Sequence, residues 1–168
     1  MNQTDVIDAI LGDEYSERVL ALRAQKPELG TQMQTYYDAL FRPSEGSSMA
    51  FPLADRLLIA IRTASHTGST SVVDWYSACA ARSGVASGYI QAAKNVDSVW
   101  PSGDRLFAAM RHVDLITSRP AESTKADIDA LLADGLTPQG IVVLSQVVAY
   151  VSYQLRLIAV LRALGASS

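Results

Sequence analysis

The sequence has one cysteine, Cys79, and two histidines, His66 and His112, in 168 residues. A single cysteine cannot close an intrachain disulfide, so a reducing, cytoplasmic location is the simplest interpretation. Two separate histidines give no ligand spacing for zinc or iron, and we expect no metal site. No glycine-rich phosphate loop is present, because Gly84 and Gly88 do not form the dinucleotide-binding pattern. We therefore expect no cofactor.

The sequence also lacks a basic tract. The net charge is −3 and the isoelectric point is about 5.3, so nucleic acids and anionic membrane surfaces are not expected partners. The first residues contain acidic side chains and no basic segment followed by a long apolar core. That composition is not typical of a signal peptide, which again favours the cytoplasm.

No stretch of alternating apolar and polar residues predicts a long β-strand, and helical spacing dominates instead. We expect one all-α domain over residues 1–168. It comprises an N-terminal helical extension at 1–50, a core helix pair at 51–84 and a long C-terminal helix at 137–165, in which Thr137 caps and Pro138 opens the helix. Hydrophobic residues make up 49% of the chain, a surplus that predicts apolar surface buried between subunits.

The core helix pair is the most informative stretch. Its first helix has apolar residues at helical spacing on one face: Leu57, Leu58, Ile61 and Ala64. Gly68 fits the junction between the helices, and Ser71 with Asp74 resembles a capping box that starts the second helix. The N-terminus of a helix presents free N–H groups and the positive end of the dipole, so it would stabilise a thiolate, phosphate or carboxylate.

Residues 51–84 resemble the core of the carboxymuconolactone decarboxylase and alkylhydroperoxidase D-like (AhpD-like) family. The resemblance is carried by Ala54, Arg56, the run Leu58 to Ile61, Gly68 and the small-residue helix that follows. It implies an all-α fold of about seven or eight helices. It also implies a homo-oligomer, a trimer or hexamer, with the site near a subunit interface.

Peroxidases of that family carry the pattern Glu-x11-Cys-x-x-Cys-x-x-x-His. Aligned on Gly68, its four reactive positions fall on Leu57, Ser69, Val72 and Tyr76, and all four depart from it. A serine hydroxyl is not ionised without a base in reach, valine cannot close a disulfide, and leucine supplies no carboxylate. We therefore predict that the thiol peroxidase chemistry is lost.

Other side chains could still support chemistry. Tyr76, Asp74 and His66 are the candidate catalytic residues, and Trp75 and Arg156 are the candidate ligand-binding residues. Each also has a structural interpretation, which we favour. Asp74 would cap the start of the second helix, and His66 would lie at the C-terminus of the first. Tyr76 and Trp75 would pack in the core. Arg156 lies on a stripe of small residues in the last helix, where a buried arginine would need a carboxylate, a carbonyl or an anionic ligand. Its structural interpretation is a salt bridge inside the oligomer.

Three functional hypotheses follow. In the first, the chain is a family member that has lost redox chemistry and keeps a small-molecule pocket or only an assembly role. In the second, it is a cofactor-free decarboxylase or lyase that acts on a small organic acid through Tyr76, Asp74, His66 or Arg156. In the third, it reduces hydroperoxides with Cys79 alone.

Overall fold

The computed structural model describes residues 5–12, 17–42 and 51–166, and the regular structure in these ranges is entirely helical. The all-α prediction is confirmed. The described helices are α1 Val6–Leu11, α2 Glu17–Ala24, α3 Pro27–Phe41, α4 Leu53–Ser65, α5 Thr70–Arg82, α6 Ser87–Lys94, α7 Phe107–Ser118, the short 3₁₀ helix η2 Pro120–Glu122, α8 Lys125–Ala133 and α9 Pro138–Ala166.

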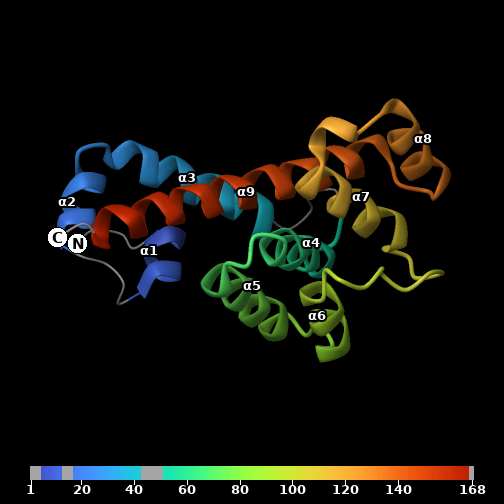
Figure 1. Cartoon of the computed structure of the whole chain (residues 1–168), viewed down its shortest axis with the longest axis horizontal. Coiled ribbons are helices and arrows are strands. Elements are labelled where there is room, and N and C mark those ends of the chain that lie inside the picture. Colours follow the sequence, from blue (N-terminus) through green and yellow to red (C-terminus); the bar gives the residue numbers. More distant parts are fainter. Residues whose placement is uncertain (1–4, 13–16, 43–50, 167–168) are drawn as a thin grey trace.

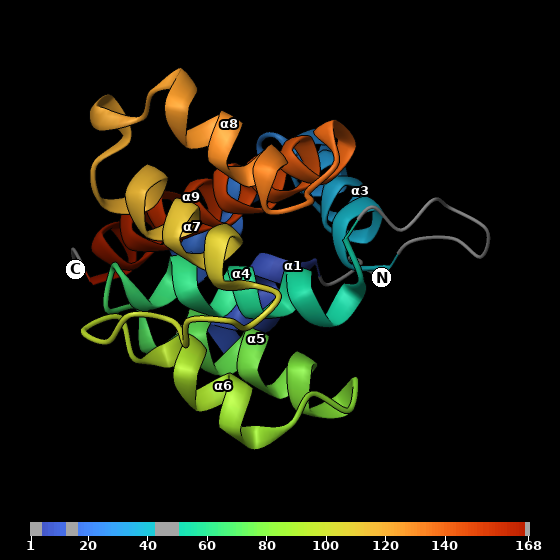
Figure 2. The same cartoon turned by 90° about the vertical axis from the view of Figure 1, so that its right-hand side faces the viewer.

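Helix α4 lies at the centre of the fold. Figures 1 and 2 show it between α9 on one side and α5 and α6 on the other, with α7 also against it. Ten of its thirteen residues are buried, including the whole predicted core face: Leu57, Leu58, Ile61 and Ala64. Burying a leucine or isoleucine side chain contributes about 1.5–3 kcal/mol, so this helix is a main source of stability.

Helix α9 runs along the length of the molecule (Figure 1). It begins as predicted, with the Thr137 hydroxyl accepting a hydrogen bond from the Gly140 amide at 3.0 Å. Eleven of its residues are buried, and none of its residues is acidic. Among the described residues it is the one helix long and apolar enough to cross a membrane. Half of its most apolar window is buried inside the protein.

The predicted extension at 1–50 contains α1, α2 and α3, while residues 1–4, 13–16 and 43–50 lie outside the described part. Buried Arg56 joins this extension to the core. Its Nε donates to the Phe51 carbonyl and its Nη1 to the Leu40 carbonyl, both at 2.8 Å. Because burial disfavours the charged form, it lowers the pKa of Arg56. The two carbonyls compensate part of that penalty and fix where α3 ends and α4 begins.

Candidate functional site

The junction between α4 and α5 has the glycine turn expected from the sequence. Gly68 adopts φ +69°, and α5 begins two residues later at Thr70. The capping box predicted from Ser71 and Asp74 is wrong, because the N-cap is Ser69. Ser71 already lies in the first turn, and its hydroxyl accepts a hydrogen bond from Arg162 at 2.8 Å. Asp74 is exposed on α5, with its carboxylate 3.8 Å from the Lys94 ammonium.

The four positions of the peroxidase pattern do not form one site. Leu57, Val72 and Tyr76 are buried, with exposed fractions of 2%, 0% and 0%. Ser69 instead lies at the surface of the turn and makes no capping hydrogen bond through its side chain. Three of these positions therefore belong to the packed core, and only Ser69 faces a cleft.

Tyr76 takes part in a buried chain of hydrogen bonds. Its hydroxyl donates to Gln154 Oε1 at 2.5 Å, and Gln154 Nε2 donates to the Tyr150 hydroxyl at 3.4 Å. The Tyr150 hydroxyl in turn donates to the Met33 carbonyl at 3.0 Å, which connects α5, α9 and α3. Burial raises the pKa of Tyr76 well above its ordinary value, and the nearby Tyr150 adds to the effect. This arrangement suits a structural role, since buried polar groups need partners.

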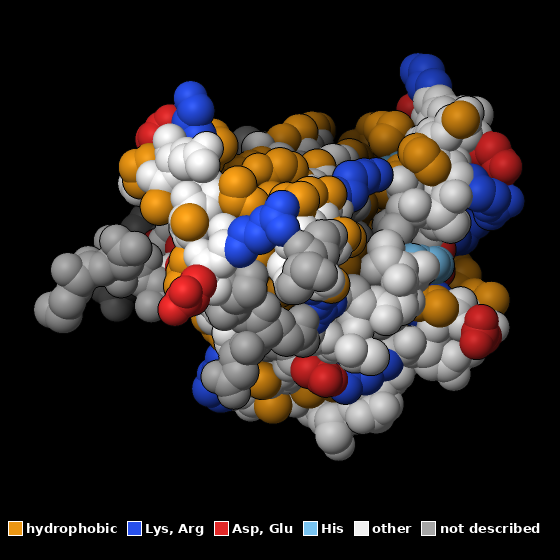
Figure 3. Space-filling model, turned by 60° about the vertical axis from the view of Figure 1, so that its left-hand side comes forward, with side chains coloured by type: hydrophobic (Ala, Val, Ile, Leu, Met, Phe, Trp, Pro, Cys, Tyr) orange, Lys and Arg blue, Asp and Glu red, His pale blue; other side chains and the backbone are white. Residues whose placement is uncertain are grey.

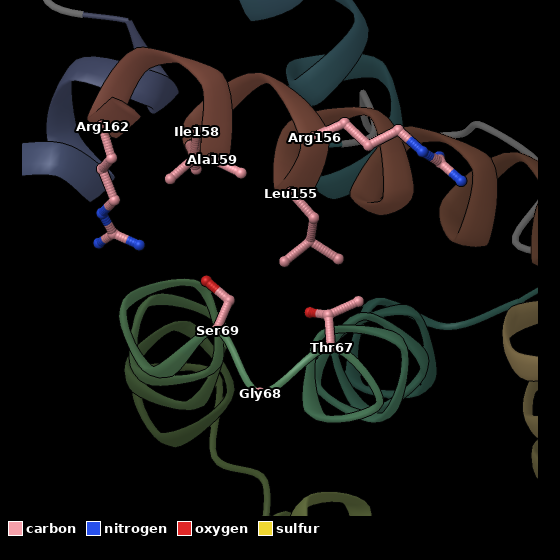
Figure 4. Close-up of a pocket in the computed structure, with 8 residues that line it drawn as sticks. All are labelled: Thr67, Gly68, Ser69, Leu155, Arg156, Ile158, Ala159 and Arg162. Carbon is pink, nitrogen blue, oxygen red and sulfur yellow. The ribbon is translucent and has the colours of Figure 1, made fainter. Parts of the chain in front are cut away.

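A cleft of about 400 Å³ separates the α4–α5 turn from α9 (Figure 4), and we call it the turn cleft. Its eight lining residues are Thr67, Gly68, Ser69, Leu155, Arg156, Ile158, Ala159 and Arg162. In Figure 4 the Arg162 side chain reaches from α9 towards the start of α5, whereas Arg156 extends along α9. Arg156 is exposed. Its Nη1 donates to the Ser152 carbonyl at 3.2 Å, so this arginine already has a carbonyl partner.

The turn cleft is positive in character. Two of its eight lining residues are arginines and none is acidic. The start of α5 also borders it, and a helix N-terminus carries partial positive charge on its free N–H groups. Leu155, Ile158 and Ala159 provide apolar lining. The cleft can therefore accept a negatively charged group together with a small apolar portion.

Sequence reasoning missed a second cluster, in which Asp114 of α7 meets two residues of α4. Arg62 binds the Asp114 carboxylate through Nε at 2.6 Å and Nη2 at 2.8 Å, and His66 Nε2 lies 2.7 Å from Oδ1. Burial alone would raise the pKa of Asp114. The hydrogen bonds from His66 and Arg62 outweigh burial and hold that pKa below its ordinary value.

All three nitrogens of the Arg62 guanidinium donate hydrogen bonds in this cluster. Its Nη1 donates to the carbonyls of Asn95 at 2.5 Å and Ala92 at 3.3 Å, and its Nη2 also donates to the Ser98 carbonyl at 3.0 Å. Arg62 therefore holds the end of α6 against α4. Arg62 and His66 are four residues apart, a spacing that places both on one side of a helix and that the sequence alone could have shown. No residue near them in the chain indicated Asp114 as their partner.

The remaining candidates lie outside the turn cleft. Trp75 and Cys79 are half-buried side chains of α5 that pack against the core. Arg82 Nη2 donates to Cys79 Sγ at 3.1 Å, and the Tyr37 hydroxyl lies 3.8 Å from the same sulfur. His112 is buried on α7, and this burial lowers its pKa. Among the described residues, no three histidine, cysteine or acidic side chains gather where a metal ion could bind.

Among the described residues, the geometry thus offers the turn cleft, which is open and positive, and a half-buried histidine–carboxylate pair. Comparison with known proteins adds no name to either: no protein-family model matches this sequence, and no curated protein matches it significantly.

Proposed function

We propose that this chain is a relative of the AhpD-like family that has lost thiol redox chemistry and binds a small organic acid in the turn cleft. One observation carries the proposal. Arg156, Arg162 and the start of α5 border the same cleft of about 400 Å³, and no acidic side chain lines it. The family assignment itself rests on the resemblance of residues 51–84.

The lining suggests how such a ligand would be held. Its carboxylate would accept hydrogen bonds from free N–H groups at the start of α5 and from the Arg162 guanidinium, which gives charge-assisted contacts. Its apolar part would lie on Leu155, Ile158 and Ala159. A cleft of this volume is at the lower end of the range for small-molecule sites, so the ligand should be compact.

Calorimetric titration of the full chain tests this proposal. The probes are benzoate, hexanoate and succinate, with benzyl alcohol as the uncharged counterpart of benzoate. We expect at least one acid to bind and benzyl alcohol not to bind. Arg162→Gln should weaken binding about tenfold, since a hydrogen bond to a charged group contributes about 1.5–3 kcal/mol. Arg156→Gln should weaken binding less, because its guanidinium extends along α9 and donates to the Ser152 carbonyl. Ala159→Trp should block binding by filling the cleft.

Arg119→Gln is the matched control, because Arg119 is an exposed arginine that pairs with Glu122 and does not line the turn cleft. It should leave binding unchanged. The proposal is overturned if none of the three acids binds, or if Arg119→Gln weakens binding as much as Arg162→Gln does.

A second candidate function is the lyase or decarboxylase activity on an organic acid. The observation that favours it is the 2.7 Å contact between His66 and Asp114, because a carboxylate can orient a histidine that transfers protons. Incubation with the same acids, followed by proton NMR, would detect turnover. Turnover that disappears in His66→Gln would support this candidate, and an unchanged spectrum for all three acids would exclude it for them.

A further inference from the structure

The turn cleft contains two hydroxyl groups in addition to its arginines. Among the eight described residues that line it, Thr67 and Ser69 are the two with a hydroxyl group, and they lie on either side of Gly68. In Figure 4 both side chains rise from the turn towards α9, and the Thr67 hydroxyl is turned to the side on which Ser69 lies. A ligand between the turn and α9 would therefore meet both hydroxyl groups.

The Thr67 hydroxyl can only accept a hydrogen bond from such a ligand. Its hydrogen is already donated to the Ala64 carbonyl in the last turn of α4, at 2.8 Å. A hydroxyl oxygen has two lone pairs, so Thr67 Oγ1 remains an acceptor. An ionised carboxylate has only acceptor atoms and does not complement this oxygen. A fully complementary ligand needs a hydrogen-bond donor as well as its carboxylate.

The backbone at the end of α4 leaves this acceptor role to the side chain. The Thr67 amide donates to the Ala64 carbonyl at 3.1 Å, and the Gly68 amide donates to the Ser65 carbonyl at 3.2 Å. These two carbonyls of the last turn of α4 therefore already have donors within the protein. Thr67 Oγ1 is the acceptor that faces the cleft.

Thr67 lies close to the expected position of the ligand carboxylate. Only Gly68 and Ser69 separate it from Thr70, the first residue of α5, so the Cα atoms of Thr67 and Thr70 are at most about 11 Å apart. Gly68 has no side chain, and the space beside it is open. A donor that reaches Thr67 from a carboxylate at the start of α5 must therefore lie near that carboxylate in the ligand.

We propose that the turn cleft prefers a 2-hydroxy acid, in which the carbon next to the carboxylate carries a hydroxyl group, and that Thr67 recognises this group. The inference rests on the proposed function, in which the carboxylate binds Arg162 and the start of α5. The ligand hydroxyl would donate to Thr67 Oγ1, while the apolar part lies on Leu155, Ile158 and Ala159. Three separate contacts distinguish mirror-image ligands, so one enantiomer should bind more tightly.

The charges of the cleft disfavour a 2-amino acid, whose ammonium group could also donate to Thr67. Arg156 and Arg162 both line the cleft, and none of the eight lining residues is acidic. An ammonium group would be repelled by the two arginines and would have no carboxylate to pair with. A hydroxyl group supplies the same hydrogen bond without the charge, so the hydroxy acid is the better match.

A small acid also suits the surface of the molecule better than a polyanion does. Figure 3 shows Lys and Arg side chains interspersed with Asp and Glu on the face that it draws, rather than gathered into one basic surface. The net charge of the chain is −3. Polyanions bind to extended basic surfaces, so we expect a compact ligand that is held by individual groups of the cleft.

Calorimetric titration of the full chain with three acids of one carbon skeleton tests the inference. Phenylacetate has no substituent next to its carboxylate, mandelate has a hydroxyl group there, and phenylglycine has an ammonium group. We expect the preferred enantiomer of mandelate to bind about fivefold more tightly than phenylacetate, the order of effect of one additional hydrogen bond between neutral groups. Phenylglycine should bind more weakly than phenylacetate.

Substitutions of Thr67 test its assigned role. Thr67→Val removes the hydroxyl and nearly keeps the shape of the side chain, so it should bind mandelate and phenylacetate about equally. Thr67→Ser keeps a hydroxyl and should retain the preference for mandelate. Thr35→Val is the matched control, because Thr35 is an exposed threonine whose hydroxyl donates to the Thr31 carbonyl at 2.9 Å and does not line the turn cleft. It should retain the full preference.

The outcomes separate this inference from the proposed function. Equal binding of mandelate and phenylacetate by the wild type would overturn the inference and leave the proposed function intact. So would tighter binding of phenylglycine than of mandelate, or a preference that is lost in Ser69→Ala but kept in Thr67→Val. If neither mandelate nor phenylacetate binds, the proposed function fails, and the inference fails with it.

Discussion

At the scale of single residues, one chain of hydrogen-bonded polar groups lies inside the protein. Tyr76 and Gln154 form a buried pair from two helices 78 positions apart in the sequence. The sequence indicated only that Tyr76 would contribute to packing or to catalysis. Its partner became visible only when α5 and α9 were placed together.

We predict that Tyr76→Phe lowers the free energy of unfolding by about 1–3 kcal/mol, because Gln154 Oε1 loses its donor inside the core. Urea denaturation at neutral pH measures the change. Tyr89→Phe is the comparison, since the Tyr89 hydroxyl donates to Asp104 at the exposed surface. Its loss should be clearly smaller, and equal losses would argue against the buried network.

The Asp114 cluster predicts a specific pH dependence. The folded protein holds the pKa of Asp114 below its ordinary value. The carboxylate therefore contributes stability that is present above about pH 3.9 and is lost as the pH falls through the folded pKa. Asp114→Asn should lower the free energy of unfolding at neutral pH by about 2–4 kcal/mol, because almost fully buried Arg62 loses its carboxylate partner.

Urea denaturation of the wild type and of Asp114→Asn at a series of pH values measures this effect. The difference between the two should shrink as the pH falls below about 4. Asp129→Asn provides the control, because Asp129 pairs with Lys125 at the exposed surface. A constant Asp114→Asn difference across that range would contradict the assigned role of the carboxylate.

Cys79 lies in the last turn of α5, at the opposite end from the N-terminal position that the peroxidase pattern uses for its first thiol. Val72 also leaves no second thiol nearby. We predict that the purified protein consumes no hydroperoxide in the presence of dithiothreitol beyond the rate of Cys79→Ser. A faster wild-type rate, followed by peroxide assay, would restore the peroxidase hypothesis.

At the scale of helices, local signals predicted several features correctly. The buried face of α4, the glycine turn at Gly68 and the start of α9 at Thr137 and Pro138 all follow from patterns within a few residues. The predicted start of α5 was wrong because two serines and a threonine in succession can each cap a helix. The sequence favoured the one followed by Asp74, whereas in the fold Arg162 binds the Ser71 hydroxyl.

The glycine turn predicts opposite effects for two similar substitutions. Gly68→Ala should lower the free energy of unfolding by about 1–2 kcal/mol. Gly68 has a φ of +69°, and a residue with a Cβ is strained in this left-handed conformation. The space around it is open, so no clash adds to this value. Gly88→Ala, inside α6 and also in open space, should be neutral or stabilising by up to about 1 kcal/mol. Thermal unfolding compares them, and matching shifts would contradict the turn geometry.

At the scale of the whole molecule, the all-helical architecture was predictable because hydrophobic spacing repeats along the chain. The turn cleft and the Asp114 cluster could not be predicted in this way. Both the turn cleft and the Asp114 cluster join segments that are at least 48 positions apart in their key contacts, such as His66 with Asp114 and Ser71 with Arg162. No local pattern encodes such pairs, and a single sequence carries no information on which distant residues meet.

Helix α9 contacts α1, α2, α3, α4, α7 and α8, so it should be indispensable to the fold. We predict that a chain ending at Thr137 shows little helical circular dichroism and no cooperative unfolding, because eleven buried residues are lost. A chain ending at Leu164 should fold normally, since it loses only the partly exposed end of α9. Cooperative melting of the shorter chain would contradict the central role of α9.

The position of α9 in the chain has a consequence for biosynthesis. At about 5–20 residues per second, roughly 4–17 s pass between translation of Leu53, the first residue of α4, and arrival of the ribosome at Pro138. During this interval the side of α4 that packs against α9 has no permanent cover. The nascent polypeptide should therefore depend on chaperones until its last long segment has been made, and its folding should be largely delayed until then.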